Sequence, residues 1–192
     1  IALQHATNKQ NISDGIFYGL EKPADTLFAS TVPYCDIELE PYVYDLELAG
    51  QILDEAGWKM GSGNVREKDG QPLNIDLLYN SDSVTEKSIA EYLQSEYQSI
   101  GVSLNIHGEE EQSYRDNMKA GNFDMVFNIC WGTPYDPQSS LAAMRAPVYG
   151  DYAAQLGLDD KAEIDDAITE ILITTDENRR QELYTYVLTH LH

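Results

Sequence analysis

Basic residues are scarce in this sequence. Lys and Arg together number 12, against 33 Asp and Glu in 192 residues, and the formal net charge is −21. This balance excludes a nucleic-acid-binding role, because a protein that binds phosphate backbones needs a basic face. We expect most of the negative charge to lie on a solvated surface, where it can also attract cations at long range.

Long hydrophobic runs and cysteines are also few. No apolar run reaches the roughly 18 residues of a membrane-spanning helix, so the sequence predicts no span. The two cysteines, Cys35 and Cys130, leave two alternatives open. They could form a disulfide in an oxidising compartment, or Cys130 could be a buried free thiol in an apolar strand.

Enzyme signatures are absent: there is no Gly-rich phosphate loop, no G-x-S-x-G turn and no H-E-x-x-H motif. The carboxylate run Glu109–Glu111 is interpreted as favourable charge at a helix N-terminus rather than as a metal or acid–base site. The pairs Asp159-Asp160 and Asp165-Asp166 are expected to be solvated. The sequence therefore predicts a protein that is not an enzyme.

The four histidines show no spacing suited to a metal ion; they are His5, His107, His190 and His192. His190 and His192 lie two positions apart, so on a helix they point in different directions and cannot share one ion. We therefore expect no metal site built from protein ligands alone.

Strand-like and helix-like patterns alternate through the middle of the chain. The expected elements are a strand over 73–79, a helix from the capping pattern Ser83-x-x-Glu86 to Gly101, a strand over 102–106, a helix over 110–120 and a strand over 123–130. Such alternation predicts parallel pairing with right-handed crossovers. The fold class is therefore α/β, with a mixed, mainly parallel sheet flanked by helices.

The flanking segments complete one expected α/β lobe over residues 1–192. They comprise a helix over 1–18, an extended segment over 19–44, a helix that begins after Asp45 and stops at Gly57, a turn over 61–71, a short helix over 138–144, a loop over 147–158, and two final helices of which Thr174 caps the second. Both chain ends read like helix interiors, so we expect a piece of a longer protein with Ile1 and His192 close together.

The segment Gly121–Arg145 organises these predictions. Its strand, Phe123–Cys130, is apolar enough to be central and buried on both faces. The strand stops at a stiff turn, Trp131–Pro137, that contains one Gly and two Pro. Ligands of open α/β sheets bind at the carboxyl ends of strands.

Aromatic rings cluster after this strand; they are Trp131, Tyr135, Tyr149 and Tyr152. Rings at the rim of a site suit stacking on an organic ligand. The alternative is that Trp131 and Tyr135 are core residues.

Several blocks of the sequence resemble one transport family. They are Ala2–Lys9 (ALQHATNK), Ala24–Ala29 (ADTLFA), Glu55–Trp58 (EAGW), Arg66–Leu73 (REKDGQPL), Gly108–Glu111 (GEEE), Trp131–Pro137 (WGTPYDP) and Asp151–Leu158 (DYAAQLGL). Over essentially the whole chain, the sequence resembles the second lobe of solute-binding proteins of ABC importers in the dipeptide/oligopeptide/nickel family, and it is most similar to the nickel branch.

The resemblance implies a two-lobed, type II periplasmic-binding-protein-like fold that closes on its ligand. It also implies nickel as the transported ligand, held as a small organic chelate such as nickel-histidine, with no tightly bound cofactor. The implied partner is an ABC permease in the membrane, and the implied location is periplasmic or at the cell surface.

The resemblance also suggests ligand-binding residues. Trp131 and Tyr135 match aromatic pocket residues of the family. Tyr114 lies one position from another pocket tyrosine, and Arg115 occupies the matching place. Tyr149 stands where a relative has a histidine that touches the metal, so no residue of this chain is assigned as a metal ligand.

Three rival hypotheses remain open. Within the family, a di- or oligopeptide-binding protein would use Asp136 to meet the amino terminus of a peptide. Outside it, a hydrolytic enzyme would use surface carboxylates, and an acidic interaction domain would expose a large apolar patch.

Overall fold

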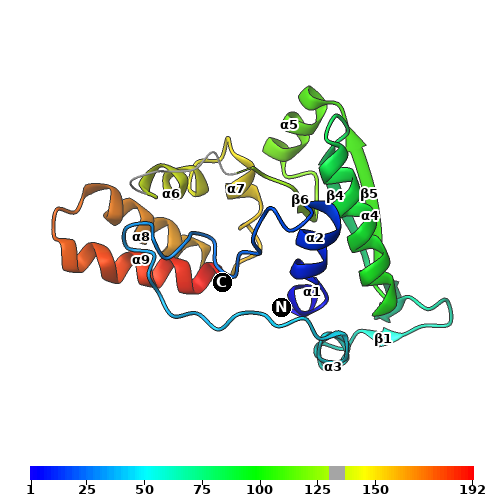
Figure 1. Cartoon of the computed structure of the whole chain (residues 1–192). Helices are drawn as coiled ribbons and strands as arrows, with labels where there is room; N and C mark the ends of the chain where they lie inside the picture. The colour runs from blue at the N-terminus through cyan, green and yellow to red at the C-terminus, as the bar shows by residue number, and fades with distance from the viewer. Residues whose placement is uncertain (130–136) are drawn as a thin grey trace. The chain divides into compact units, whose positions relative to one another are not determined.

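The computed structural model describes residues 1–129 and 137–192 (Figure 1). The chain divides into two compact units. Unit 1 comprises residues 1–23, 42–116 and 123–127, and unit 2 comprises residues 24–41, 117–122 and 128–192. Two predictions relate residues of different units and therefore stay predictions. They are the single lobe over 1–192 and the proximity of Ile1 to His192.

The main sheet of unit 1 is parallel. Its strands are β4 (Asn74–Asn80), β5 (Ser103–Glu109) and β6 (Met125–Val126), in the order β5-β4-β6. In the register, Leu77 of β4 lies opposite Ile106 of β5 and Met125 of β6. The predicted α/β class with parallel pairing is confirmed.

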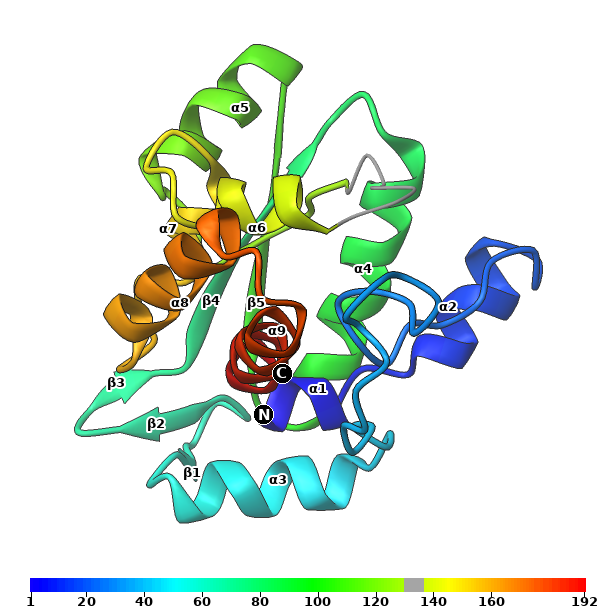
Figure 2. The same ribbon diagram turned by 90° about the vertical axis from the view of Figure 1, so that its left-hand side faces the viewer.

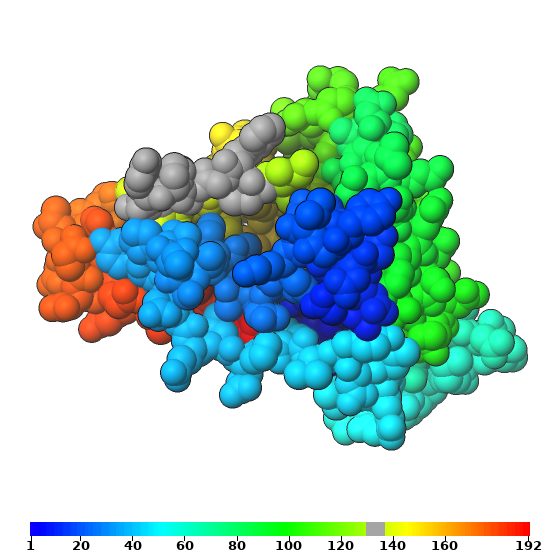
Figure 3. Space-filling model, viewed as in Figure 1, coloured from blue at the N-terminus to red at the C-terminus, as the bar shows by residue number. Residues whose placement is uncertain are grey.

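Helices cover the sheet of unit 1. They are α1 (Ala2–His5), α2 (Lys9–Ile16), α3 (Leu46–Glu55) and α4 (Val84–Ser99). Helix α4 packs along β4 and β5 (Figures 1 and 2), and α1 and α2, in dark blue, lie beside α3 and α4 (Figure 3). Helix α5 (Glu111–Ala120) follows β5.

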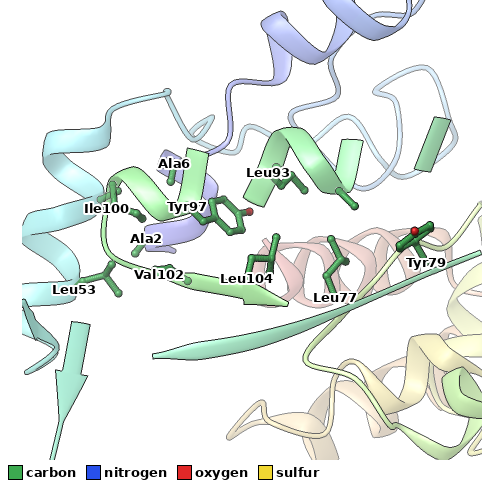
Figure 4. Packing of buried hydrophobic residues seen from close by; sticks show 12 residues of the cluster. Ala2, Ala6, Leu53, Leu77, Tyr79, Leu93, Tyr97, Ile100, Val102 and Leu104 are labelled. Carbon is green, nitrogen blue, oxygen red and sulfur yellow. The ribbon is translucent and has the colours of Figure 1, made fainter. Parts of the chain in front are cut away.

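The core of unit 1 lies between α4 and the apolar face of the sheet (Figure 4). Its buried residues are Ala2, Ala6, Ala49, Leu53, Leu77, Tyr79, Ala90, Leu93, Tyr97, Ile100, Val102 and Leu104. The hydroxyl groups of Tyr97 and Thr7 are hydrogen-bonded at 3.0 Å, which satisfies the polar end of a ring that is otherwise buried. The periodic apolar positions of the sequence thus form one continuous core.

Two predicted helix starts and stops are confirmed. The carboxylate of Asp45 accepts a hydrogen bond from Leu48 N at 2.9 Å, and Ser83 Oγ accepts one from Glu86 N at 3.2 Å. Gly57 and Gly101 follow the ends of α3 and α4 with φ of +90° and +81°.

The N-terminal helix and the turn over 61–71 are corrected by the structure. Residues 1–18 form two helices, because Asn8 interrupts the first and accepts a hydrogen bond from Asn11 N at 2.9 Å as the cap of α2. Around the predicted turn, three short strands form an antiparallel sheet; they are β1 (Lys59–Met60), β2 (Arg66–Lys68) and β3 (Gln71–Pro72).

The prediction of a central strand over 123–130 is wrong for its described residues. β6 covers only Met125–Val126, lies at the edge of the sheet and is half-buried. Ile129 is 66% exposed, and Cys130 lies outside the described residues. β4 occupies the central position instead, because pairing on both sides buries Leu77 and Leu78 more completely than any apolar residue of β6.

Unit 2 is helical where it is described. Its helices are α6 (Gln138–Met144), α7 (Gly150–Ala153), α8 (Lys161–Ile173) and α9 (Glu177–Leu191). The short α7 lies within the predicted loop over 147–158. The buried residues are Phe28, Cys35, Leu141, Met144, Ile164, Ala167, Ile168, Ile171, Leu183, Tyr184, Val187 and Leu188.

The cap of α9 differs from the prediction. Asp176 accepts hydrogen bonds from Asn178 N at 3.0 Å and Arg179 N at 3.1 Å, whereas Thr174 ends α8. The extended segment over 19–44 is confirmed, since no described helix or strand lies between Ile16 and Leu46. Tyr34 anchors this segment within unit 2, because its ring stacks on Tyr184 at 4.9 Å and its hydroxyl donates to Glu177.

Candidate functional site

The carboxyl ends of β4 and β5 meet at one edge of the parallel sheet in unit 1. Asn80 ends β4 and lies opposite Glu109, which ends β5. The chain leaves this edge for α4 and α5, whose first turns carry Glu86 and Glu111. Because open α/β sheets bind ligands at this edge, we take it as the candidate site of unit 1 and call it the carboxyl edge.

Tyr114 is held inside the carboxyl edge. Its side chain is buried, and its hydroxyl donates a hydrogen bond to the carbonyl oxygen of Phe127, just after β6. Burial raises the pKa of Tyr114 to about 12, with the Glu86 and Glu111 carboxylates adding to the increase. Tyr114 is therefore neutral at physiological pH, and its described hydrogen bond joins α5 to the end of β6.

Arg115 lies in a three-residue network at the carboxyl edge. Its guanidinium forms an ion pair with Glu111 Oε1, one helical turn earlier. Glu111 Oε2 accepts a hydrogen bond from the Asn80 amide at the end of β4. The Arg115 side chain is 54% exposed, so the guanidinium is held in place while it remains open to solvent.

The other predicted site residues lie elsewhere. Trp131, Tyr135 and Asp136 fall outside the described residues. Tyr149 belongs to unit 2, where it is 51% exposed and immediately precedes α7. The structure places Tyr114 and Arg115, which are consecutive on α5, at the carboxyl edge, and the ligand-binding roles of all these residues stay predictions.

Sequence reasoning missed Asn80 and Glu86 as parts of this edge. The Glu86 carboxylate accepts a hydrogen bond from Asn80 N at 2.8 Å, so it fixes the loop that leaves β4 instead of completing the capping box at Ser83. The signal available in the sequence was Asn80, a polar residue at the end of a strand in which apolar residues alternate. The placement of Glu111 in the first turn of α5 is as predicted.

Each of the four histidines has a polar partner close by in the structure. His107 lies 3.1 Å from Asp76, His5 bonds the carbonyl of Val43 at 2.8 Å, and the His190 and His192 rings bond the carbonyls of Tyr186 and Glu40 at 2.7 Å. Within residues 1–129 and 137–192, no group of three or more His, Cys, Asp or Glu could hold a metal ion.

Two of the acidic residues that were expected to be solvated are only partly exposed. Asp165 pairs with Lys161, and Asp160 lies 3.5 Å from His190.

In the described part of the chain, no helix is both long and apolar enough to cross a membrane.

Comparison with known proteins identifies relatives across the whole chain. The chain is 44% identical over 192 residues to the nickel-binding periplasmic protein of Escherichia coli strain K12, and 25% identical over 191 residues to the dipeptide-binding protein of the same strain. These relatives are solute-binding proteins and not enzymes, as predicted. The chain spans 37% and 34% of their lengths.

Solved structures agree on the fold. NikA from Brucella suis, in complex with Fe(III)-EDTA, matches with a TM-score of 0.94 and 48% identity over the whole of this chain and 39% of that one. NikZ from Campylobacter jejuni, in complex with Ni(L-His), matches in fold with a TM-score of 0.81 and 22% identity over 99% of this chain and 38% of that one. These neighbours are two-lobed periplasmic binding proteins, which confirms the predicted fold class.

The model of the family described as "Bacterial extracellular solute-binding proteins, family 5 Middle" matches residues 1–151. That span includes both strands and both helices of the carboxyl edge, together with the segment Trp131–Pro137. The chain belongs to the bacterial extracellular solute-binding proteins of family 5.

Proposed function

We propose that this chain forms part of the substrate-binding component of an ABC importer for nickel, which is taken up as a small organic chelate such as nickel-histidine. The observation that carries the proposal is the 44% identity to a nickel-binding periplasmic protein over all 192 residues. Nickel is the transported ligand in this proposal, and closure of two lobes around the chelate is the function.

The ligand-binding residues proposed for this chain are aromatic or cationic. Trp131, Tyr135 and Tyr149 supply rings for stacking on the chelator, Tyr114 shapes the carboxyl edge, and Arg115 supplies a positive charge. The absence of a suitable cluster of metal ligands among the described residues supports recognition of the chelator rather than of the bare ion.

The proposal includes a partner and a location. The closed protein would deliver its ligand to an ABC permease, and it would work in the periplasm or at the cell surface. The names of the relatives, which include a nickel-binding periplasmic protein, support this location.

Native mass spectrometry of the full-length protein tests the proposal. Nickel is added with and without free histidine. We expect a complex whose added mass equals nickel plus the chelator, and a much weaker signal for nickel alone. A protein that binds neither nickel nor its chelates would contradict the proposal.

Trp131→Ala is expected to weaken binding of the chelate to the full-length protein by about 1–3 kcal/mol, because an aromatic stacking surface is lost. Titration calorimetry with nickel-histidine measures the effect, and thermal unfolding monitors stability. If the variant is largely unfolded but its folded fraction binds the chelate with full affinity, Trp131 is a core residue.

The isolated 192-residue chain is expected to bind nickel weakly or not at all in the absence of a chelator. Among its described residues no cluster of three metal-ligating side chains exists, and two-lobed proteins bind between their lobes. Calorimetry with nickel chloride checks this, and sub-micromolar affinity would contradict it.

A peptide ligand is the second candidate. The supporting observation is the 25% identity to the dipeptide-binding protein over 191 residues. Asp136 would then meet the amino terminus of the peptide. Competition of dipeptides against nickel-histidine in the same calorimeter separates the two ligands.

A further inference from the structure

We infer that the Glu111 carboxylate occupies the place beside Arg115 that a ligand carboxylate would take. When the chelate binds, Arg115 exchanges Glu111 for a carboxylate of the chelate. The inference rests on the proposed function and specifies the ligand class: chelates that carry carboxylate groups. The ion pair between Arg115 and Glu111, at the carboxyl edge of the sheet, carries the argument.

Arg115 lies among acidic residues at the carboxyl edge. The segments 80–87 and 109–115 form the carboxyl edge and contain five acidic residues: Asp82, Glu86, Glu109, Glu110 and Glu111. Their two cations are Lys87 and Arg115, and Lys87 lies 3.9 Å from Glu91, farther along α4. An anionic ligand at this edge therefore needs Arg115 to offset the surrounding carboxylates.

Glu111 can release Arg115 without losing every partner. Glu111 Oε1 accepts from the guanidinium, whereas Oε2 accepts from the Asn80 amide. After an exchange, Glu111 would keep the bond from Asn80 and its favourable place in the first turn of α5.

Solvent exposure weakens the ion pair between Arg115 and Glu111. The Arg115 and Glu111 side chains are 54% and 45% exposed, and exposed ion pairs between residues four apart on a helix are weak. A carboxylate that accepts two parallel hydrogen bonds from the guanidinium would compete well with Glu111, which uses one oxygen for Arg115. Glu111 is thus a weakly held internal substitute for a ligand anion.

The test measures dissociation constants of the full-length protein for three probes. Nickel-EDTA and nickel-histidine carry carboxylates, and nickel-triethylenetetramine carries none. Arg115→Gln should weaken binding of the two carboxylate chelates about tenfold, the loss expected for a charged hydrogen-bonded contact. It should leave the affinity for nickel-triethylenetetramine unchanged or slightly improved.

Glu111→Gln should have the opposite effect and strengthen binding of nickel-EDTA about threefold or more, because Arg115 no longer has a competing anion. The matched controls are Glu110→Gln and Lys119→Gln. Glu110→Gln removes a negative charge, as Glu111→Gln does, and Lys119→Gln removes a positive charge, as Arg115→Gln does. Both controls leave the pair intact, since Glu110 and Lys119 are exposed residues outside the network.

Equal effects of Glu111→Gln and Glu110→Gln would show a general charge effect and overturn the inference. Unchanged carboxylate affinities in Arg115→Gln would overturn it while leaving the proposed function in place, provided that the wild-type protein binds a nickel chelate. A wild-type protein that binds none of the three probes would overturn both.

Discussion

Replacing Leu77 by alanine is expected to lower the free energy of unfolding by about 3 kcal/mol, the middle of the range for a buried leucine. Leu77 is 1% exposed and occupies the centre of β4, where its neighbours in the register are Ile106 and Met125. Alanine would leave a cavity between the sheet and α4 that the two flanking strands prevent from closing. Urea unfolding of the full-length protein, followed by circular dichroism, measures the change.

Two further variants make this experiment selective. Leu77→Met conserves volume and is expected to cost less than about 1.5 kcal/mol. Val126→Ala, in the half-buried edge strand β6, is expected to cost clearly less than Leu77→Ala. If Val126→Ala proves the more damaging, β6 is the better-packed strand and the packing described for the sheet is wrong.

Replacing Arg66 by methionine is expected to cost about 3 kcal/mol, because buried hydrogen-bond acceptors lose their donor. Arg66 is buried, with 6% of its surface exposed. Its Nε donates to the carbonyl of Ile100 at 2.7 Å, and its Nη1 donates to the carbonyl of Trp58 at 2.7 Å and to Asp54 at 2.9 Å. One side chain thus ties β2 to the ends of α3 and α4.

Lys59→Met is the matched control for Arg66→Met. Lys59 also pairs with Asp54, at 3.5 Å, but its side chain is 67% exposed. Its loss is therefore expected to cost less than about 1 kcal/mol. Equal costs for the two variants would show that the shared ion pair, and not the buried hydrogen bonds, is what Arg66 contributes.

The same network predicts a pH dependence. The hydrogen bond from Arg66 holds the pKa of Asp54 below its usual value. A carboxyl group with a lowered pKa in the folded state stabilises the protein above its unfolded-state pKa of about 4, and that contribution is lost as the pH falls through the folded-state pKa. Arg66→Met should therefore lose less stability than wild type between neutral pH and about pH 3. A parallel decline in both proteins would contradict this.

Local sequence patterns predicted the elements whose signals lie within a few residues. Asp45 and Ser83 cap their helices as expected, and Gly57 and Gly101 end them in left-handed conformations. Alternation of apolar residues predicted β4 and β5. These features follow from neighbours along the chain, since a cap or a one-sided apolar stripe requires no distant partner.

The candidate site was only partly predictable. Tyr114 and Arg115 were singled out through the family resemblance, but the hydrogen bond from Asn80 to Glu111, the ion-pair partner of Arg115, became visible only when the ends of β4 and β5 met. Residues about 30 positions apart cannot be paired from local spacing, because the register of two parallel strands brings them together.

By itself, the sequence determined the alternation of strands and helices, the acidic surface and the membership of a solute-binding family. Only the tertiary structure decided that β4 is the central strand, that β6 is a short edge strand, and that Arg66 is buried. The physical reason is that apolar composition indicates that a segment tends to be buried, whereas pairing and packing between distant segments determine which one occupies the centre.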